Sequence, residues 1–445
     1  MRRRSIACVF LGAALCAYPV PAAEPVTLTL QDAVHMALAQ NHDLKIARLK
    51  VVENEQKKAI ARSSYFPEIT NHSTASHLTD LENIRIPEGA LGVSPGLVPN
   101  RDIVIGQGAQ NLVTSGTMVA QPLTPLIRIH QANRIAASEI SASRDELKKS
   151  ENEIAVHVHE VYYGILIARL QKQAAEQEIA YSNTRLRESD DDVRNGSALK
   201  VSAIESRAGV LQSQQELLTI DLQIEDLNTE LNDLLGLPLG TPLVLSPVAS
   251  AVFVETSREE TLRTALEENP QVKSALESVQ QAKAAVTAAK SAYIPDVSVF
   301  ARHSYQNGVA FLVHNFGTFG VSLNYDIFDF GKRRATIRER EAQLAQAEQN
   351  VERLKDAVGV RIERSLNKVE RTRQMLRVAA EVVKLRTESD RLAENQLKQG
   401  VVLVSARRQA SAASYKAEAD LLQAQLAHLL ARAELEQAIG RTPGK

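Results

Sequence analysis

The sequence predicts a mostly α-helical protein with a small β part, in which one structural unit occurs twice. Three observations support this fold class. Short motifs recur at fixed spacings, alternating apolar and polar residues precede helical patterns, and those helical patterns run for more than sixty residues without proline. We expect each unit to contain short helices, a β-hairpin and a long helical hairpin.

The internal repeat is visible in two sets of matching residues. The motif Ala-Leu-x-x-Asn stands at 37–41 and again at 265–269, and Tyr-x-Pro stands at 65–67 and again at 293–295, both at an offset of 228 residues. Later matches have an offset of 204 residues, such as Gly196 with Gly400 and Gly236 with Gly440. The first copy therefore carries 24 extra residues, the difference between these offsets, in one enlarged loop between Pro67 and Gln121.

The chain is expected to begin with a secretory signal peptide over residues 1–23. Three arginines precede an apolar run, and small residues at its end provide a cleavage site. Both cysteines, Cys8 and Cys16, lie within this segment, so the mature chain is predicted to have neither disulfides nor thiolate metal sites. The first structural repeat then covers residues 24–256 and the second covers 257–445.

Two strands are predicted in each repeat, at about 68–77 and 109–121 and at about 296–306 and 315–327. The last strand alternates most regularly, with an apolar face opposite a face of Thr, Gly, Ser and Asn. One apolar and one polar face is typical of a membrane barrel wall. A half-buried soluble hairpin is the alternative for any one strand taken alone. We interpret the apolar residues of the last strand as lipid-facing: Phe319, Val321, Leu323 and Tyr325.

Long helices account for most of the chain. Helical patterns cover about 130–194 and 332–399, and a return helix follows the glycine that ends each of them. At ~1.5 Å per residue, each long helix spans on the order of 100 Å. The first return helix has a heptad seam, which predicts packing against a neighbouring helix: Leu217, Ile220, Ile224, Leu227, Leu231 and Leu234.

The junction between the last strand and its helix resembles a known family. Residues 327–333, Ile-Phe-Asp-Phe-Gly-Lys-Arg, are similar to the strand-to-helix junction of the TolC-type outer-membrane efflux factors, with Phe330 in place of a glycine. The resemblance covers essentially the whole mature chain. It implies a homotrimer with a shared 12-stranded outer-membrane β-barrel and a periplasmic α-helical tunnel. The residues themselves indicate only that four strands are too few, because the smallest membrane barrels have eight.

The resemblance also implies a function and partners. The chain would be the outer-membrane exit duct of a tripartite efflux system, passing small molecules from an inner-membrane pump and a periplasmic adaptor to the exterior. It would have no catalysis and no cofactor. A type I protein-secretion duct is the alternative within the family, and a periplasmic coiled-coil adaptor or structural stalk is the alternative from another class. The formal net charge of −1 gives no sign of nucleic-acid binding.

The resemblance places candidate sites at the two helical turns. Asn195-Gly196 and Gln399-Gly400 match the tip turns that dock an adaptor, although a glycine is also the common residue for ending a helix. The family's periplasmic gate maps to nearby positions, where its usual aspartates are absent from the second copy. We expect a contact of Glu205 with Arg407 or Arg408 between neighbouring hairpins. The gate candidates are Ser202, Glu205, Arg207, Ala406, Arg407, Arg408 and Gln409.

Other features of the sequence give weaker indications. Ser197 and Lys200 fit a Ser-x-x-Lys pattern without its companion motifs, and His157 and His159 are expected on different faces of a helix, so no enzyme or metal site is predicted. The basic residues 332–334 favour anchoring where a barrel meets helices. Residues 81–108 are rich in Gly and Pro, and we expect this enlarged loop outside the cell.

Overall fold

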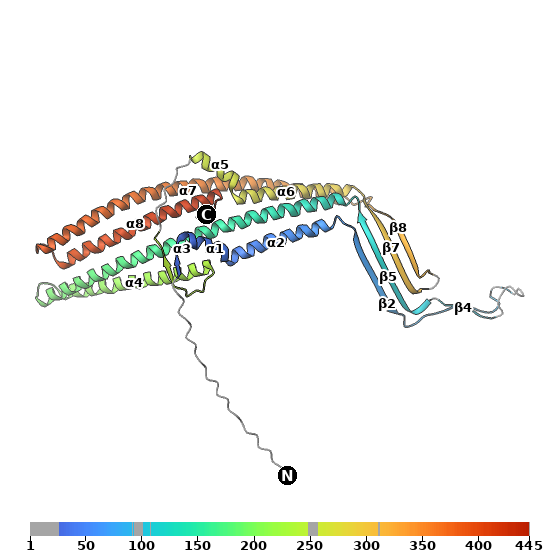
Figure 1. The fold of residues 1–445 in the computed structure, drawn as a ribbon, viewed down its shortest axis with the longest axis horizontal. Helices are drawn as coiled ribbons and strands as arrows, with labels where there is room; N and C mark the ends of the chain where they lie inside the picture. The colour runs from blue at the N-terminus through green and yellow to red at the C-terminus, as the bar shows by residue number, and fades with distance from the viewer. Residues whose placement is uncertain are drawn as a thin grey trace, which may run out of the picture.

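The computed structural model describes residues 26–90, 92, 101–106, 108–247, 257–309 and 312–444. The predicted signal peptide lies outside these residues. Long helices lie side by side along most of the molecule, and a four-stranded sheet continues from one end of them (Figure 1). Among the described residues, no helix is both long and apolar enough to cross a membrane.

The two halves of the chain share one order of main elements: two short helices, two long strands, a long helix and a return helix. The first half contains β1 Val26–Leu28, α1 Leu30–Gln40, α2 His42–Ser63, β2 Glu68–His77, β3 Ile84–Ile86, β4 Ile103–Ile105, β5 Gly108–Pro122, α3 Leu126–Arg194, α4 Lys200–Leu235 and β6 Leu243–Leu245. The second half contains α5 Arg258–Glu268, α6 Pro270–Lys290, the short 3-10 helix η1 Ser291–Tyr293, β7 Asp296–Val309, β8 Asn315–Asn324, α7 Lys332–Lys398 and α8 Val404–Ile439. The fold class predicted from the sequence is thus confirmed.

The four long strands form one antiparallel sheet in the order β2-β5-β7-β8. Glu68 pairs with Ala120, and Asp296 pairs with Asn324. These two pairs correspond under the sequence offsets of 228 and 204, so the two hairpins have the same register. The strands β2 and β8 form the two edges of this sheet.

The strand predictions fall within one residue of the observed ends except at two ends, where β7 runs three residues further and β8 stops three residues earlier. The strand predicted at 68–77 is β2, and the strands predicted at 109–121 and 296–306 are slightly longer than expected. The strand predicted at 315–327 ends at Asn324, so Tyr325 lies just beyond it. The Arg333 guanidinium lies over the Tyr325 ring, 4.9 Å from its centroid, and donates a hydrogen bond to the Asp326 carbonyl. The chain therefore turns instead of continuing the ladder.

Two small sheets were not predicted. The strands β1 and β6 pair in parallel, and the Tyr162 hydroxyl of α3 lies within hydrogen-bond distance of two carbonyl oxygens, Leu28 of β1 at 3.0 Å and Ser246 just after β6 at 2.7 Å. This sheet covers the main hydrophobic core, where Val34, Ile165 and Leu231 are fully buried. The strands β3 and β4 form a short hairpin in the enlarged loop.

The helix α3 is the central helix of the bundle. It contacts α2, α4, α6 and α8, whereas α7 contacts α6 and α8. The predicted heptad seam of α4 faces the neighbouring helices, because its residues are buried or half-buried. Leu218 and Leu222, on the other side of α4, are exposed. The helices α2 and α4 therefore border one side of the chain and α7 borders the other.

The two return helices end on equivalent glycines that contact the turn between two short helices. Gly236 ends α4 with φ +68°, and Gly440 ends α8 with φ +108°. A Cβ atom on Gly440 would lie 2.8 Å from the Asn269 Cα and 2.9 Å from the Glu268 carbonyl oxygen. Asn269 also donates a 3.0 Å hydrogen bond from Nδ2 to the Ala438 carbonyl. The end of α8 and the α5–α6 turn therefore fit closely.

We predict that Gly440→Ala destabilises the protein by about 2–3 kcal/mol, because it combines a left-handed backbone with a backbone clash. Gly400→Ala is the matched control, since Gly400 has φ +71° and nothing within 4 Å of its added Cβ. The control should cost only about 1 kcal/mol. Thermal unfolding midpoints of the two purified variants provide the measurement, and equal midpoints would contradict the close fit.

Candidate functional site

The sheet has one apolar and one polar face. Phe319, Val321 and Leu323 of β8 lie on the same face as Val299 and Ile69, as the strand register requires, and all five side chains are exposed in the single chain. The opposite face carries mainly polar residues: Thr70, His72, Arg302, Ser304, Thr318, Ser322 and Asn324. A sheet with these two faces can separate lipid from an aqueous lumen.

The apolar face becomes polar toward the enlarged loop. One step beyond Ile69, Asn71 donates a 2.8 Å hydrogen bond to the Thr117 hydroxyl, and the Ser73 and Ser115 hydroxyls lie 2.9 Å apart. These side chains share the outward face because outward residues recur every second position along a strand. The apolar band on the sheet is therefore confined to the part nearer the helices.

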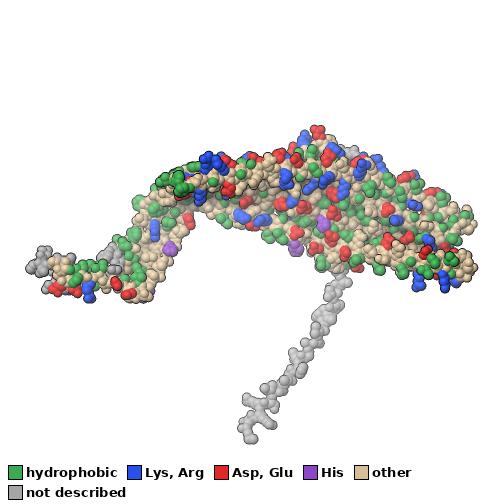
Figure 2. Space-filling model, turned by 180° about the vertical axis from the view of Figure 1, so that it is seen from behind, with side chains coloured by type: hydrophobic (Ala, Val, Ile, Leu, Met, Phe, Trp, Pro, Cys, Tyr) green, Lys and Arg blue, Asp and Glu red, His purple; other side chains and the backbone are tan. Residues whose placement is uncertain are grey.

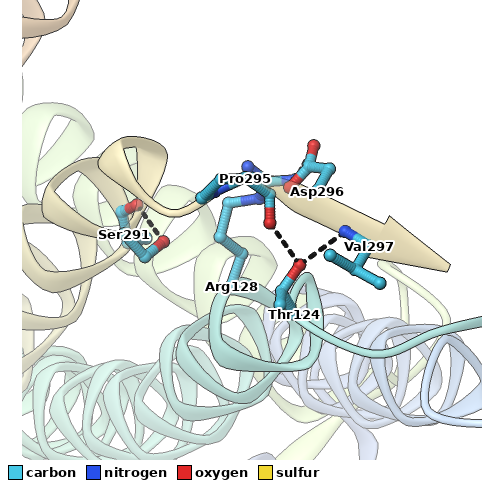
Figure 3. A network of polar contacts seen from close by, with 7 residues as sticks. Thr124, Arg128, Ser291, Pro295, Asp296 and Val297 are labelled. Carbon is cyan, nitrogen blue, oxygen red and sulfur yellow. Dashed lines mark hydrogen bonds and ion pairs between the residues drawn. The ribbon is translucent and has the colours of Figure 1, made fainter. Parts of the chain in front are cut away.

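The two repeats are joined where the sheet meets the helices (Figure 3). The Thr124 hydroxyl donates to the Pro295 carbonyl at 2.6 Å and accepts from the Val297 backbone N–H at 2.7 Å. Arg128, in the first turn of α3, forms an ion pair with Asp296 at the start of β7, with an N–O distance of 2.7 Å. These contacts connect the first repeat's helix to the second repeat's strand.

The turn from β8 into α7 is fixed by Asp329. Its carboxylate accepts hydrogen bonds from the Gly331 and Arg333 backbone N–H groups and from the Arg333 Nε, at 2.7–3.0 Å. Arg333 also lies over the rings of Tyr325 and Tyr293, at 4.9 and 5.4 Å from their centroids. Within this turn, Phe330 has a positive φ of 50°, which no other described residue except glycine adopts.

Both predicted tip residues Gly196 and Gly400 close their turns in the left-handed conformation, with φ of +76° and +71°. In each turn the N–H after the glycine donates to a helix carbonyl, Ser197 to Asp192 and Val401 to Gln396, both at 2.9 Å. Asn195 and Gln399 are the residues that end the two long helices. Apolar side chains follow both glycines and are exposed: Leu199, Val201, Val401 and Leu403.

The helical hairpins contact one another near these tips through Glu188. Its carboxylate on α3 accepts a 2.9 Å hydrogen bond from the Ser405 backbone N–H in the first turn of α8. The N-cap of α8, Leu403, has no side-chain acceptor of its own. Glu188 therefore satisfies a free N–H group of a helix in the other repeat.

The predicted gate residues are only partly brought together. Arg407 forms a 2.7 Å ion pair with Glu394 of its own hairpin, and Glu205, Arg207 and Arg408 are exposed. Ala406 and Gln409 are also exposed. Sequence reasoning missed Glu188 and Glu394. Glu188 contacts the other hairpin, and Glu394 contacts a residue on the far side of the turn in its own hairpin, so neither contact follows from local sequence patterns. The lack of a capping side chain before α8 was the one sequence feature that could have indicated Glu188.

A polar hollow of about 700 Å³ lies between α3, α4 and α8. Ser202 and Glu205 line it from α4, and Lys416 lines it from α8. Glu178 lines it from α3, and burial raises the pKa of this carboxyl, with a further upward shift from Glu216 and an opposing effect of Lys416. The hollow is therefore a charged, water-accessible surface between the two hairpins.

The chemistry-bearing motifs of the sequence occupy structural positions. The Ser197 hydroxyl donates a 2.9 Å hydrogen bond to the Asp192 carbonyl. His157 lies 3.1 Å from Glu230 on the surface, whereas His159 is buried and its Nδ1 lies 2.7 Å from the Ala155 carbonyl. In the described part of the chain, no three His, Cys, Asp or Glu side chains are grouped as a metal site would require.

Comparison with known proteins agrees with this architecture. A family model described as outer membrane efflux protein matches residues 33–237 and 261–441. The outer membrane efflux protein BepC of Brucella suis is 23% identical over 351 residues, which is 78% of this chain and 70% of BepC.

Solved structures show the same fold. The Campylobacter jejuni CmeC outer membrane channel has a TM-score of 0.75 at 16% identity, with 92% of this chain and 85% of CmeC covered. The outer membrane protein VceC of Vibrio cholerae has a TM-score of 0.70 at 16% identity, with 93% and 96% covered. With the family model matching most of its length, this chain belongs to the outer membrane efflux protein family and is an outer-membrane efflux channel.

Proposed function

We propose that three copies of this chain form the exit duct of a tripartite efflux system, without catalysis or a cofactor. The observation that carries this proposal is the four-stranded sheet, which has one apolar face and two open edges, β2 and β8. Open edges in lipid leave backbone groups without hydrogen-bond partners, so each edge must pair with another copy. Three copies supply twelve strands, which is enough for a closed barrel.

The internal repeat supplies the register of this closure. Inside one chain, β5 of the first repeat pairs with β7 of the second, and Ala120 lies opposite Phe300. Shifting these positions by the two offsets gives Asn324 of β8 opposite His72 of β2 in the next copy. The offsets already relate the two hairpins within the chain, where Glu68–Ala120 corresponds to Asp296–Asn324.

The same shift applies to the ion pair between Arg128 and Asp296, where the sheet meets the helices. Arg128 corresponds to Lys332 and Asp296 corresponds to Glu68, so both charges are kept in sign. Lys332 of one copy would then pair with Glu68 of the next copy, as Arg128 pairs with Asp296 inside the chain. Because Lys332 and Glu68 have opposite charges, pairing of β8 in one copy with β2 in the next is favoured over pairing of two identical edges. This head-to-tail pairing produces a ring.

The tip turns are proposed as the docking site for a periplasmic adaptor connected to an inner-membrane pump. Asn195, Gly196, Gln399 and Gly400 form two similar turns at the end of the hairpins remote from the sheet (Figure 1). The exposed Leu199 and Leu403 beside them offer apolar contacts that a partner can cover.

The entrance to the tunnel is proposed to be held closed by contacts between hairpins near the tips. The bond between Glu188 and Ser405 connects the two hairpins of one copy. Arg407 is engaged by Glu394, which leaves the exposed Arg408 as the better partner for Glu205 of a neighbouring copy. Each exposed ion pair contributes only ~0–1 kcal/mol, but three equivalent pairs act on one opening equilibrium.

Cysteine cross-linking tests the proposed register, because the mature chain has no cysteine of its own. We predict that the double variant Asn324→Cys with His72→Cys yields covalent trimers on oxidation. Within one chain β8 and β2 lie at opposite edges of the sheet, so a disulfide must join two copies. Non-reducing electrophoresis of membranes gives the readout.

The matched control is Asn324→Cys with Thr74→Cys, which is two residues out of register on the same face. Its Cβ atoms would be ~7–8 Å apart, too far for a disulfide. The control should stay monomeric on the gel. Stronger cross-linking of the control would overturn the register, and no cross-linking of either variant would contradict pairing of β8 with β2.

Planar-bilayer conductance tests the entrance. We predict that Glu188→Ala raises single-channel conductance, because α8 loses its acceptor from the other hairpin, and that Asp190→Ala at the same depth does not. Glu205→Ala and Arg408→Ala should also raise conductance, and combining them should add little. If Glu188→Ala, Glu205→Ala and Arg408→Ala all conduct like the unmodified channel, closure lies elsewhere, most simply in packing around Leu199 and Leu403.

A further inference from the structure

We propose that the turn between β8 and α7 is a membrane anchor, in which Ile327 and Phe330 insert into the acyl region of the periplasmic leaflet. The inference rests on the proposed barrel, because the turn directly follows its last strand. It concerns a segment outside the strands, where the chain departs from the family's usual glycine.

The backbone at Phe330 is the first observation. Its φ of 50° is unfavourable for a residue with a Cβ, and Gly331 follows in the same left-handed region with φ 89°. The surrounding contacts impose this shape, since Asp329 accepts three hydrogen bonds and Arg333 donates one to the Asp326 carbonyl. A strained residue held this firmly indicates that its side chain has a use in that position.

The second observation is the exposure of the apolar side chains in this turn. Phe330 is 91% exposed, Ile327 is 89% exposed and Phe328 is 73% exposed. The Phe328 and Phe330 rings contact edge to face, with centroids 4.6 Å apart. The turn therefore displays a rigid aromatic pair away from its own protein, which would be costly in water.

The third observation identifies lipid as the occupant. On the outward face of the sheet, the apolar band formed by Phe319, Val321 and Leu323 gives way to hydrogen-bonded Asn71 and Thr117 only one step beyond Ile69. Three apolar levels along a tilted strand span less than the ~25 Å of a full membrane band. The rest of the band must then come from residues on the helix side of the sheet, where the exposed Ile327 and Phe330 follow Leu323 along the chain.

A basic residue marks the lower boundary of this surface. The exposed Arg334 follows the turn, and a long cationic side chain next to an apolar band reaches lipid phosphates. Figure 2 shows hydrophobic side chains gathered beside Lys and Arg side chains where the sheet meets the helices. Aromatic rings with adjacent cations are the arrangement expected at the membrane–water interface.

Tryptophan fluorescence tests the anchor directly, because the chain contains no tryptophan. Phe330→Trp introduces a single indole at the turn of the full-length channel. The protein is reconstituted into phosphatidylcholine vesicles whose acyl chains carry bromine near the carbonyl end or near the middle. We expect at least a twofold loss of emission, and a larger loss for bromine near the carbonyl end.

Two control variants lie on opposite faces of β8. Phe319→Trp on the apolar face should be quenched, and Phe316→Trp, which shares the polar face with Ser304, should not. Unquenched emission from Phe330→Trp would overturn the anchor. Unquenched emission at short wavelength would show that a second copy of the chain covers the indole, and unquenched emission at long wavelength would show that the indole is exposed to water. If Phe319→Trp also escapes quenching, the barrel placement fails together with the anchor.

Discussion

The unpaired backbone along the two edges of the sheet is the constraint on which the rest of this structure depends. A strand edge in lipid cannot obtain hydrogen bonds from water, so β2 and β8 need partners outside the chain. In the proposed trimer, duplication meets this need, because the edge strand of one repeat pairs with the edge strand of the other repeat in the next copy. The register inside the chain, with Ala120 opposite Phe300, is the one proposed between copies.

The helices extend the same arrangement beyond the sheet. The central helix α3 contacts both its own return helix and α8 of the other repeat, so the two hairpins form one wall. Apolar burial is concentrated at mid-height, around Tyr162 and Leu231, where the short helices and the β1–β6 pair cover the bundle. Near the tips, contacts between helices include polar ones, as at Glu188 and Arg407, which is consistent with the opening proposed there.

The sequence predicted the repeated elements well because their patterns are long. Helices of more than sixty residues and alternating strands give strong periodic signals, and the two hairpins share a register that agrees with the two offsets. The three-residue strands β1 and β6 have no such signal, since they depend on Tyr162 far along the chain. The end of β8 was misplaced because Arg333, eight residues after Tyr325, fixes a turn there.

The candidate site was predictable in position but not in its contacts. Both glycine turns stand where the repeat places them, whereas the pairing of Arg407 with Glu394 depends on how two helices face each other. The mass of the purified channel in lipid nanodiscs tests the central claim most directly. The account predicts three times the mass of the mature chain, and a stable, folded single chain in the membrane would contradict it.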